Sequence, residues 1–202
     1  MEAVNAVIAG AATHAGFIFF EKSPRHLSVD EARDLALQAK RGGLKTVAVT
    51  VDADDRYLDD IVKVMRPDIL QLHGRETPER AAKVKSNYGL PVMKAIAISE
   101  ALDLQKLEPF QGIADRFLLD AKPPKNAVLP GGNAVSFDWN LVADLGTSID
   151  YLLAGGLDAD NVRQAILVAN PPGLDISSGV ESAPGVKDIV MIAAFLKAAR
   201  GS

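Results

Sequence analysis

Residues 151–170 read YLLAGGLDADNVRQAILVAN, and this stretch decides the fold class. It begins with an apolar run over 151–154, and Gly155 and Gly156 follow directly after that run. Nearly continuous apolar runs are typical of strands buried on both faces, as in a parallel sheet covered by helices. Apolar residues then recur on one helical face over 160–170, and Pro171 ends that pattern. The stretch therefore predicts a strand, a glycine loop and a helix in succession.

The same unit recurs along the whole chain. Strand-like runs lie at residues 16–20, 46–51, 69–72, 92–96, 116–120, 151–154 and 174–176. Helix signals fall between them: a capping box at Ser28 opens a helix to about Arg41, Thr77 with Pro78 opens another, and a last amphipathic helix is predicted over about 186–200. Alternating strands and helices argue for a parallel α/β fold. Units of about 20 to 30 residues favour a (β/α)8 TIM barrel over its main rival, a doubly wound open sheet.

The count leaves the barrel one strand short. Seven strands are recognisable, and the first element is a helix that begins almost at Met1, with Val4 and Ile8 on one face. An eight-stranded barrel needs one more strand ahead of that helix. We therefore expect residues 1–202 to form a single (β/α) barrel domain whose first strand is missing from this chain.

Bulk composition narrows the function classes. The 202 residues are 48% apolar and 24% charged, as in an ordinary soluble enzyme. A net charge of −4 predicts neither a basic surface for nucleic acid nor a polybasic membrane anchor. Three scattered histidines and no cysteine predict no zinc site and exclude disulfides. Because no apolar run is long enough to span a bilayer, we expect a cytoplasmic protein.

Two loops directly after the last two strands carry the pattern of a phosphate site. One is LAGGL, with Gly155 and Gly156, and the other is DISSGVE, with Ser177, Ser178 and Gly179. Glycine lets backbone N–H groups come close to a ligand, and such groups together with serine hydroxyls bind phosphate well. Barrels commonly hold a phosphate after their last two strands. We therefore predict phosphate binding, with two tight turns without a ligand as the alternative.

Three polar side chains follow other strands. Arg25, in EKSPRHLS, could pair with a carboxylate or phosphate of a substrate, or remain solvated. His73, in QLHG, could be an acid, a base or a hydrogen-bond donor to a substrate, or only fix its own loop. Asp120 ends an apolar strand, where a carboxyl group could act as a general acid. The structural alternative is an ion pair of Asp120 with Lys122 or Lys125.

A long loop, residues 121–136, follows Asp120. Loops of this length without secondary structure of their own are usually functional or disordered. Gly131 and Gly132 could serve as its hinge, so the sequence predicts a lid that closes over a substrate.

These motifs together resemble phosphoribosylanthranilate isomerase, a family of tryptophan biosynthesis. The matching sequence segments are GFIFFEKSPRHLS, QLHGRE, FLLDAK with PGGNAVSFDW, LLAGGLDADNV and GLDISSGVESAPGVKD. The resemblance covers nearly the whole chain from about Glu2. It implies a (β/α)8 barrel that needs no metal or organic cofactor and binds a small phosphoribosyl substrate, as a monomer or a homodimer.

The resemblance also implies a reaction, the Amadori rearrangement of N-(5'-phosphoribosyl)anthranilate to 1-(2-carboxyphenylamino)-1-deoxyribulose 5-phosphate. Asp120 matches the acid that protonates the ribose ring oxygen and opens the ring to an imine. A base then removes the C2 proton, and the enolamine becomes the ketone. Arg25 and Asp175 match residues expected at the substrate, and we place His73 with them. The phosphate loops of the family match Gly155, Gly156, Ser177, Ser178 and Gly179.

One departure from the family is large. The family's base is a cysteine on the first strand, and this chain contains no cysteine. A related isomerase that accepts a second aminoaldose uses an aspartate base on its first strand, and no candidate for that residue is found either. The alternatives are a phosphosugar-binding barrel without catalysis, or a barrel that another polypeptide completes.

Overall fold

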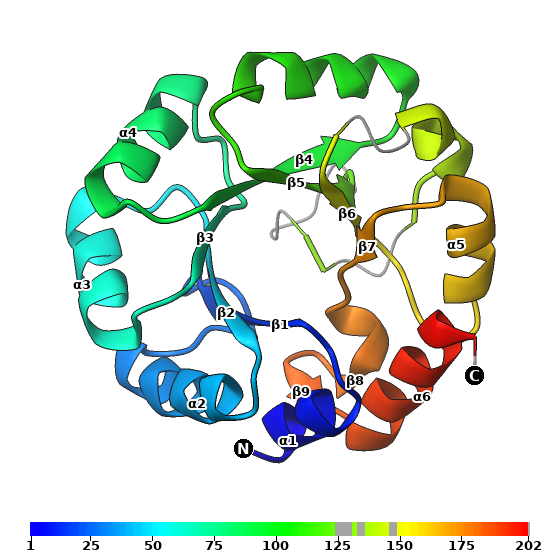
Figure 1. The fold of residues 1–202 in the computed structure, drawn as a ribbon, viewed down its shortest axis with the longest axis horizontal. Helices are drawn as coiled ribbons and strands as arrows, with labels where there is room; N and C mark the ends of the chain where they lie inside the picture. Colours follow the sequence, from blue (N-terminus) through cyan, green and yellow to red (C-terminus); the bar gives the residue numbers. More distant parts are fainter. Residues whose placement is uncertain (124–130, 133–135, 146–148, 202) are drawn as a thin grey trace.

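The computed structural model describes residues 1–123, 131–132, 136–145 and 149–201. Its main sheet has seven parallel strands in sequence order, curled so that the helices lie on its outer side (Figure 1). The strands are β1 (His14–Phe19), β2 (Lys45–Thr50), β3 (Ile69–Leu72), β4 (Val92–Ile98), β5 (Arg116–Ala121), β6 (Tyr151–Leu153) and β7 (Gly173–Leu174). The seven predicted strands and their parallel arrangement are confirmed, with ends that differ by no more than two residues.

Helices connect successive strands and cover the outer face. They are α1 (Glu2–Ala9), α2 (Val29–Arg41), α3 (Asp55–Met65), α4 (Pro78–Tyr88), η1 (Ala101–Phe110), η2 (Trp139–Leu145), α5 (Val162–Ala169), η3 (Ser178–Val180) and α6 (Ile189–Arg200). The larger core lies between sheet and helices, and a smaller cluster of Met93, Ala95, Leu118 and Ala154 packs separately from it. No helix in the described part of the chain is long and apolar enough to cross a membrane.

Local sequence signals place the helix ends. The predicted capping box at Ser28 is present, since its hydroxyl accepts from Glu31 N–H and the Glu31 carboxylate accepts from Ser28 N–H. Thr77 caps α4, since its hydroxyl accepts from Arg80 N–H, and Pro78 stands in the first turn, as predicted. These side chains satisfy N–H groups that the helix leaves unpaired, which fixes where each helix begins.

The last helix begins later than predicted. A short antiparallel hairpin, β8 (Glu181–Ala183) and β9 (Val186–Lys187), takes the residues expected to open it. Asp188 then caps α6 by accepting from two backbone N–H groups. The prediction of a helix from about 186 was therefore wrong by three residues, because apolar spacing alone does not reveal a hairpin.

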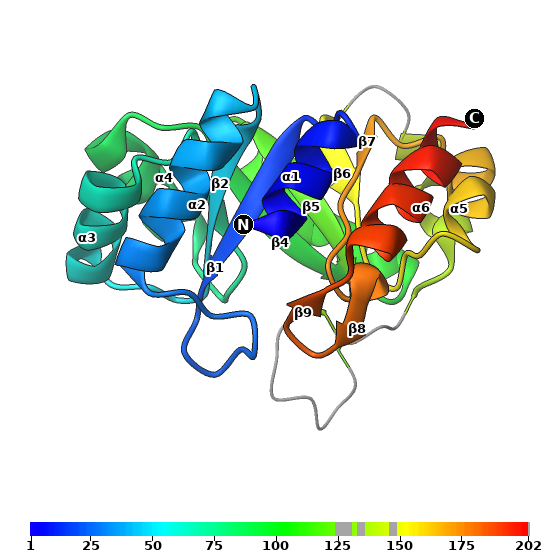
Figure 2. The same cartoon turned by 90° about the horizontal axis from the view of Figure 1, so that it is seen from below.

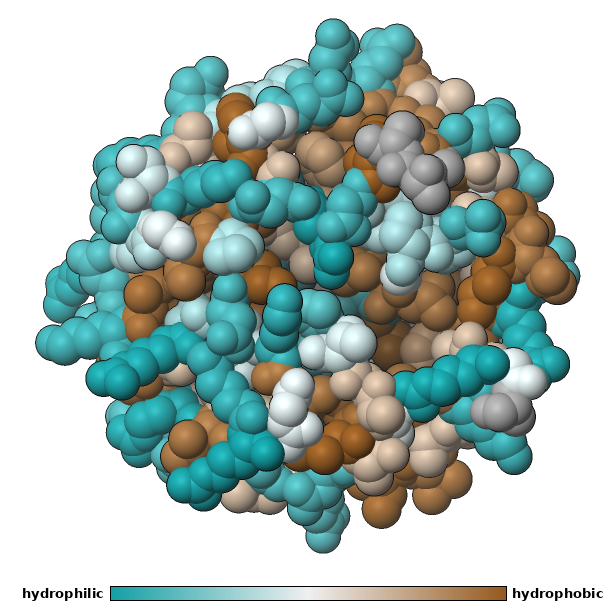
Figure 3. Space-filling view, viewed as in Figure 1, coloured by the Kyte–Doolittle hydropathy of each residue, from teal (hydrophilic) through white to brown (hydrophobic). Residues whose placement is uncertain are grey.

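The two outer strands of the sheet do not meet. β1 pairs with β2 and β7 pairs with β6, and no strand among the described residues lies between β1 and β7. A cavity of about 810 Å³ opens along this gap, lined by Ile18 on β1, Leu174 on β7 and Val4 on α1. The strand starts lie on the face seen in Figure 3, which is hollowed near its middle with apolar side chains showing between polar ones.

Candidate active site

The predicted site residues gather at one end of the molecule. Asp120 stands near the end of β5, and Arg25, His73 and Asp175 follow β1, β3 and β7. Because parallel strands all point the same way, the loops after them come together, as Figure 2 shows for the loop after β1 and the β8–β9 hairpin. One cavity is lined by all the predicted residues except Gly179, namely Arg25, His73, Asp120, Gly155, Gly156, Asp175, Ser177 and Ser178.

Asp120 contacts His73 at the mouth of the barrel. The Asp120 Oδ2 atom lies 3.3 Å from His73 Nε2, and Oδ1 accepts from the Ala121 N–H at 2.9 Å. The proposed structural partner Lys122 lies beside Asp103 instead, with 4.0 Å between Nζ and Oδ1. Lys125 falls outside the described residues. The Asp120 carboxyl group is therefore turned toward the cavity and His73, not toward Lys122.

The glycine pair of the predicted lid lies directly on these side chains. A Cβ atom added at Gly131 would come within 2.5 Å of Asp120 Oδ2 and 2.8 Å of His73 Nε2. Next to it, the Gly132 carbonyl accepts from Arg25 Nη2 at 3.4 Å. A side chain at Gly131 would therefore push Asp120 or His73 out of place. The rest of the predicted lid, residues 124–130 and 133–135, lies outside the described residues.

Asp175 is the second carboxyl group of the site. It lines the cavity and is partly buried. Burial raises the pKa of Asp175, and repulsion from Asp120 raises it further, while His73 and Lys187 oppose the change. Two neighbouring carboxyl groups of which one is favoured in its protonated form are a frequent arrangement in active sites.

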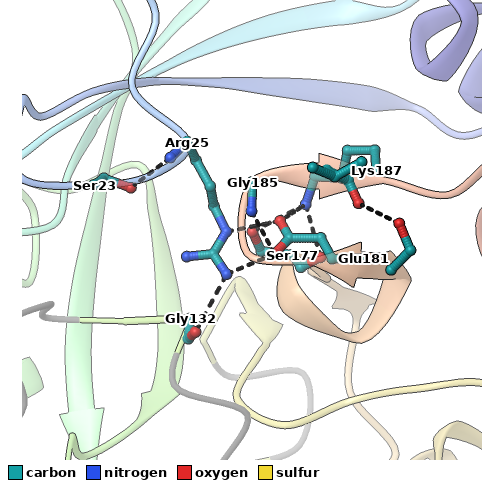
Figure 4. Close-up of polar contacts among 9 residues, drawn as sticks. Ser23, Arg25, Gly132, Ser177, Glu181, Gly185 and Lys187 are labelled. Atoms are coloured by element: carbon teal, nitrogen blue, oxygen red, sulfur yellow. Dashed lines mark hydrogen bonds and ion pairs between the residues drawn. The ribbon is translucent and has the colours of Figure 1, made fainter.

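Arg25 forms the largest polar cluster of the site (Figure 4). Its Nε and Nη2 atoms donate to the two carboxylate oxygens of Glu181 at 2.7 and 2.8 Å. Lys187 Nζ donates to Glu181 Oε1 at 2.7 Å and to the Ser177 carbonyl at 2.7 Å. Gly185 N–H donates to Glu181 Oε2 at 3.2 Å. The hairpin β8–β9 thereby ties the loop after β1 to the loop after β7.

The cluster shifts the pKa of its carboxylate strongly. Burial by itself would raise the pKa of Glu181, but hydrogen bonds from Arg25 and Lys187 outweigh it and lower the pKa to about 2. Burial lowers the pKa of Lys187, against the stabilising contact with Glu181. The charged form of Glu181 is therefore part of the folded structure.

We expect Glu181 to make folding sensitive to acid. Its pKa is about 2 when folded against an ordinary 4.5, so its contribution is complete above about pH 4.5 and is lost as the pH falls toward 2. The difference corresponds to about 3 kcal/mol of unfolding free energy. Urea unfolding at several pH values should show a smaller acid-induced loss in Glu181→Gln than in the wild type. Exposed Glu108→Gln is the control, and an equal loss in all three proteins would contradict the assignment.

The two glycine loops approach each other and β5 closely. Gly155 has a φ of +86°, and a Cβ atom there would lie 2.5 Å from Ala121 N. A Cβ atom at Gly179 would lie 1.9 Å from the Leu157 carbonyl oxygen. In the described part of the chain, the backbone N–H groups of Gly155, Gly156 and Ser178 have no hydrogen-bond partner. These loops therefore offer several free donors at one end of the cavity.

The sequence patterns did not predict three residues of the site. Gln71 lines the cavity beside His73, and Glu181 and Lys187 form the cluster with Arg25. The dipeptide Pro184-Gly185 is a turn signal that could have revealed the hairpin. Nothing local indicated that Glu181 would meet Arg25, which lies 156 residues earlier. Among the described residues, no group of three or more His, Cys, Asp or Glu side chains could hold a metal ion.

Known proteins match the chain along almost its whole length. The family described as N-(5'phosphoribosyl)anthranilate (PRA) isomerase matches residues 1–198. N-(5'-phosphoribosyl)anthranilate isomerase from Mesorhizobium japonicum is 58% identical over 201 residues, which cover 100% of this chain and 91% of that protein. The crystal structure of phosphoribosyl anthranilate isomerase from Thermotoga maritima has a TM-score of 0.88 at 31% identity, covering 100% of this chain and 94% of that chain.

A second solved structure holds a ligand. It is phosphoribosyl anthranilate isomerase in complex with reduced 1-(o-carboxyphenylamino)-1-deoxyribulose 5-phosphate, with a TM-score of 0.85, 30% identity and coverage of 100% of this chain and 94% of that chain. Sequence and fold agree along almost the whole chain. The chain therefore belongs to the phosphoribosylanthranilate isomerase family.

Proposed function

We propose that the chain acts on N-(5'-phosphoribosyl)anthranilate in tryptophan biosynthesis, in the cytoplasm, with Asp120 as the general acid. The observation that carries the proposal is a single cavity that joins the Asp120–His73 pair to the two glycine loops. A phosphosugar that reaches both places its phosphate on the loops and its ring oxygen near the acid. Family membership supplies the identity of the substrate.

The proposed chemistry begins with proton transfer from Asp120 to the ribose ring oxygen. The C1–O bond breaks, the nitrogen lone pair forms an imine, and the ring opens. A base then takes the C2 proton, giving an enolamine that becomes the ketone on reprotonation at C1. Asp120 is left as a carboxylate after the first step, and the nearby His73 side chain can stabilise that charge.

The phosphate is proposed to bind at Gly155, Gly156, Ser177, Ser178 and Gly179. The unpaired N–H groups described above support this, because backbone N–H groups are effective anion donors. Lys187 adds a positive charge beside Ser177, with 3.3 Å between Nζ and Oγ. Phosphate would therefore meet both hydrogen-bond donors and a cation.

Arg25 and Asp175 are proposed to contact the rest of the substrate. Glu181 and Gly132 occupy Nε and Nη2 of Arg25, whereas Nη1 has no hydrogen-bond partner among the described residues. That free edge suits the anthranilate carboxylate. Asp175, with its raised pKa, can donate a hydrogen bond from its protonated form to the anthranilate or ribose.

The base is proposed to belong to a strand that fills the gap between β1 and β7. Two observations support this. Among the described residues, the β7 edge toward the gap is unpaired and the β1 edge is paired only at Ile18, whose carbonyl accepts from Leu27 N–H. The cavity also runs along both edges. The relatives reported above also extend beyond the part that this chain matches. A strand in this gap would form backbone hydrogen bonds with β1 and β7, and it could bring a cysteine to the substrate.

An assay of conversion together with ligand binding separates the possible functions. Turnover of N-(5'-phosphoribosyl)anthranilate is followed by chromatography, and calorimetry measures binding of the reduced product analogue with and without its phosphate. Turnover with phosphate-dependent binding supports the isomerase. Phosphate-dependent binding without turnover indicates a phosphosugar-binding barrel, or one that needs a completing strand. Absence of both results would overturn the proposal.

A further inference from the structure

A buried ion pair lies just behind the site and takes no part in the proposed chemistry. Lys94 on β4 and Glu76, in the loop just ahead of α4, have side chains only 4% and 3% exposed, with 3.0 Å between Nζ and Oε2. Neither residue belongs to the described lining of the cavity. Burying two charges costs so much free energy that such a pair often contributes little net stability. Its hydrogen bonds indicate that the pair instead positions the backbone around His73.

The ion pair holds the backbone on both sides of His73. Lys94 Nζ donates to the Leu72 carbonyl at 3.1 Å and to the Gly74 carbonyl at 2.9 Å, besides its contact with Glu76. All three ammonium hydrogens are therefore used. The Glu76 carboxylate accepts from Gly74 N–H at 3.0 and 3.1 Å. Leu72 and Gly74 are the two chain neighbours of His73, so the pair fixes its position along the backbone.

The same carboxylate also reaches the loop after β2. Glu76 Oε1 accepts from Asp52 N–H at 3.0 Å, and Asp52 Oδ1 accepts from Arg75 N–H at 2.6 Å. A Cβ atom at Gly74 would come within 2.4 Å of Asp52 Oδ1, so the two loops are packed without space. Loops held this closely keep a catalytic side chain in one orientation.

Gln71 then holds the ring of His73. The Gln71 Nε2 atom lies 2.9 Å from His73 Nδ1, and Gln71 is only 5% exposed. On the opposite edge of the ring, Nε2 faces Asp120 Oδ2. Toward the carboxylate form of Asp120, which only accepts hydrogen bonds, Nε2 must carry the hydrogen, and Nδ1 of the neutral ring is then an acceptor. An amide N–H from Gln71 matches that acceptor.

We propose that Glu76, Lys94 and Gln71 are positioning residues that hold His73 as its Nε2–H tautomer, aimed at Asp120. Glu76 and Lys94 set the backbone, and Gln71 sets the ring. The consequence for catalysis, stabilisation of the Asp120 carboxylate after it donates its proton, rests on the proposed function. The position and tautomer of His73 do not.

Nitrogen NMR of the imidazole rings tests the tautomer without any substrate. The chain has only three histidines, so His14→Gln and His26→Gln assign the signals. At about pH 8.5, where an ordinary histidine is neutral, His73 should show one tautomer with hydrogen on Nε2. Gln71→Met, which keeps the length but removes the donor, should bring a second tautomer into the spectrum. An Nδ1–H tautomer in the wild type, or an unchanged spectrum in Gln71→Met, would overturn the role of Gln71.

Hydrogen exchange tests the ion pair. Glu76→Gln should speed exchange of the Gly74 amide and of the His73 ring N–H by about tenfold or more, which corresponds to about 1.4 kcal/mol. Glu79→Gln, an exposed position in the first turn of α4, should change neither. Because Glu76→Gln leaves Lys94 buried and unpaired, the double variant Glu76→Leu/Lys94→Met keeps the volume and removes both charges. Wild-type exchange at His73 in that folded double variant would refute the proposal.

Enzyme kinetics then separate this inference from the isomerase assignment. In a form with measurable turnover, Glu76→Gln should lower kcat by about tenfold while KM stays close to the wild-type value, because the substrate contacts remain. If the NMR and exchange results hold but no isomerase activity exists, only the proposed function fails. If activity exists and the double variant keeps the wild-type kcat, the positioning role fails.

Discussion

Asp120→Asn is expected to lower kcat for isomerisation by about two to four orders of magnitude, the usual contribution of a general acid. The amide has the size of the carboxyl group, and its single oxygen can still accept from Ala121 N–H, so the backbone around it should keep its shape. Its NH2 group then faces His73 in place of the second carboxylate oxygen. It has no acidic proton to give to the ribose ring oxygen, and this loss is specific to ring opening. Steady-state kinetics with N-(5'-phosphoribosyl)anthranilate measure the effect.

Binding distinguishes this loss from damage to the site. The dissociation constant of the reduced product analogue should change by less than about threefold in Asp120→Asn, since the phosphate loops are untouched. Asp60→Asn, on the exposed side of α3, is a matched control that should retain full turnover. If the chain alone turns over too slowly, the comparison is made in the strand-extended form described next. Wild-type kcat in Asp120→Asn would refute the assignment of the acid.

Adding a strand between β1 and β7 is expected to raise turnover strongly. A strand of about six residues is fused ahead of Met1, with alternating apolar residues and one cysteine facing the cavity. It should pair with the free edges of β1 and β7, fill part of the cavity and supply the base. Turnover should rise by about two to four orders of magnitude over that of the unextended chain.

The matched control for this experiment is the same strand with alanine in place of cysteine. Both extended proteins should unfold at a higher temperature than the unextended chain, because both cover the open edges and bury apolar surface. Only the cysteine form should gain turnover. Equal turnover in the unextended chain and the cysteine form would show that the base lies elsewhere.

The sequence predicted the strands to within two residues, and it predicted which candidate site residues follow them. Asp120 closes an apolar run, and His73 directly follows another, so a parallel arrangement brings both to one face of the sheet. The helix caps and glycine loops were predictable for the same reason, because each depends on residues close together in the chain. Gly131 was predicted as a hinge, but its close contact with Asp120 required the folded chain.

The sequence by itself determined a parallel α/β chain of seven strands with an acid, a histidine, an arginine and two glycine loops at the strand ends. Periodicity and local turn chemistry are short-range properties, so they can be read along the chain. Only the tertiary structure decided that Glu181 neutralises Arg25, that Glu76 and Lys94 hold His73, and that β1 and β7 leave a gap between them. These contacts join residues far apart in the chain, and their partners are selected by burial and charge in three dimensions, which no local pattern records.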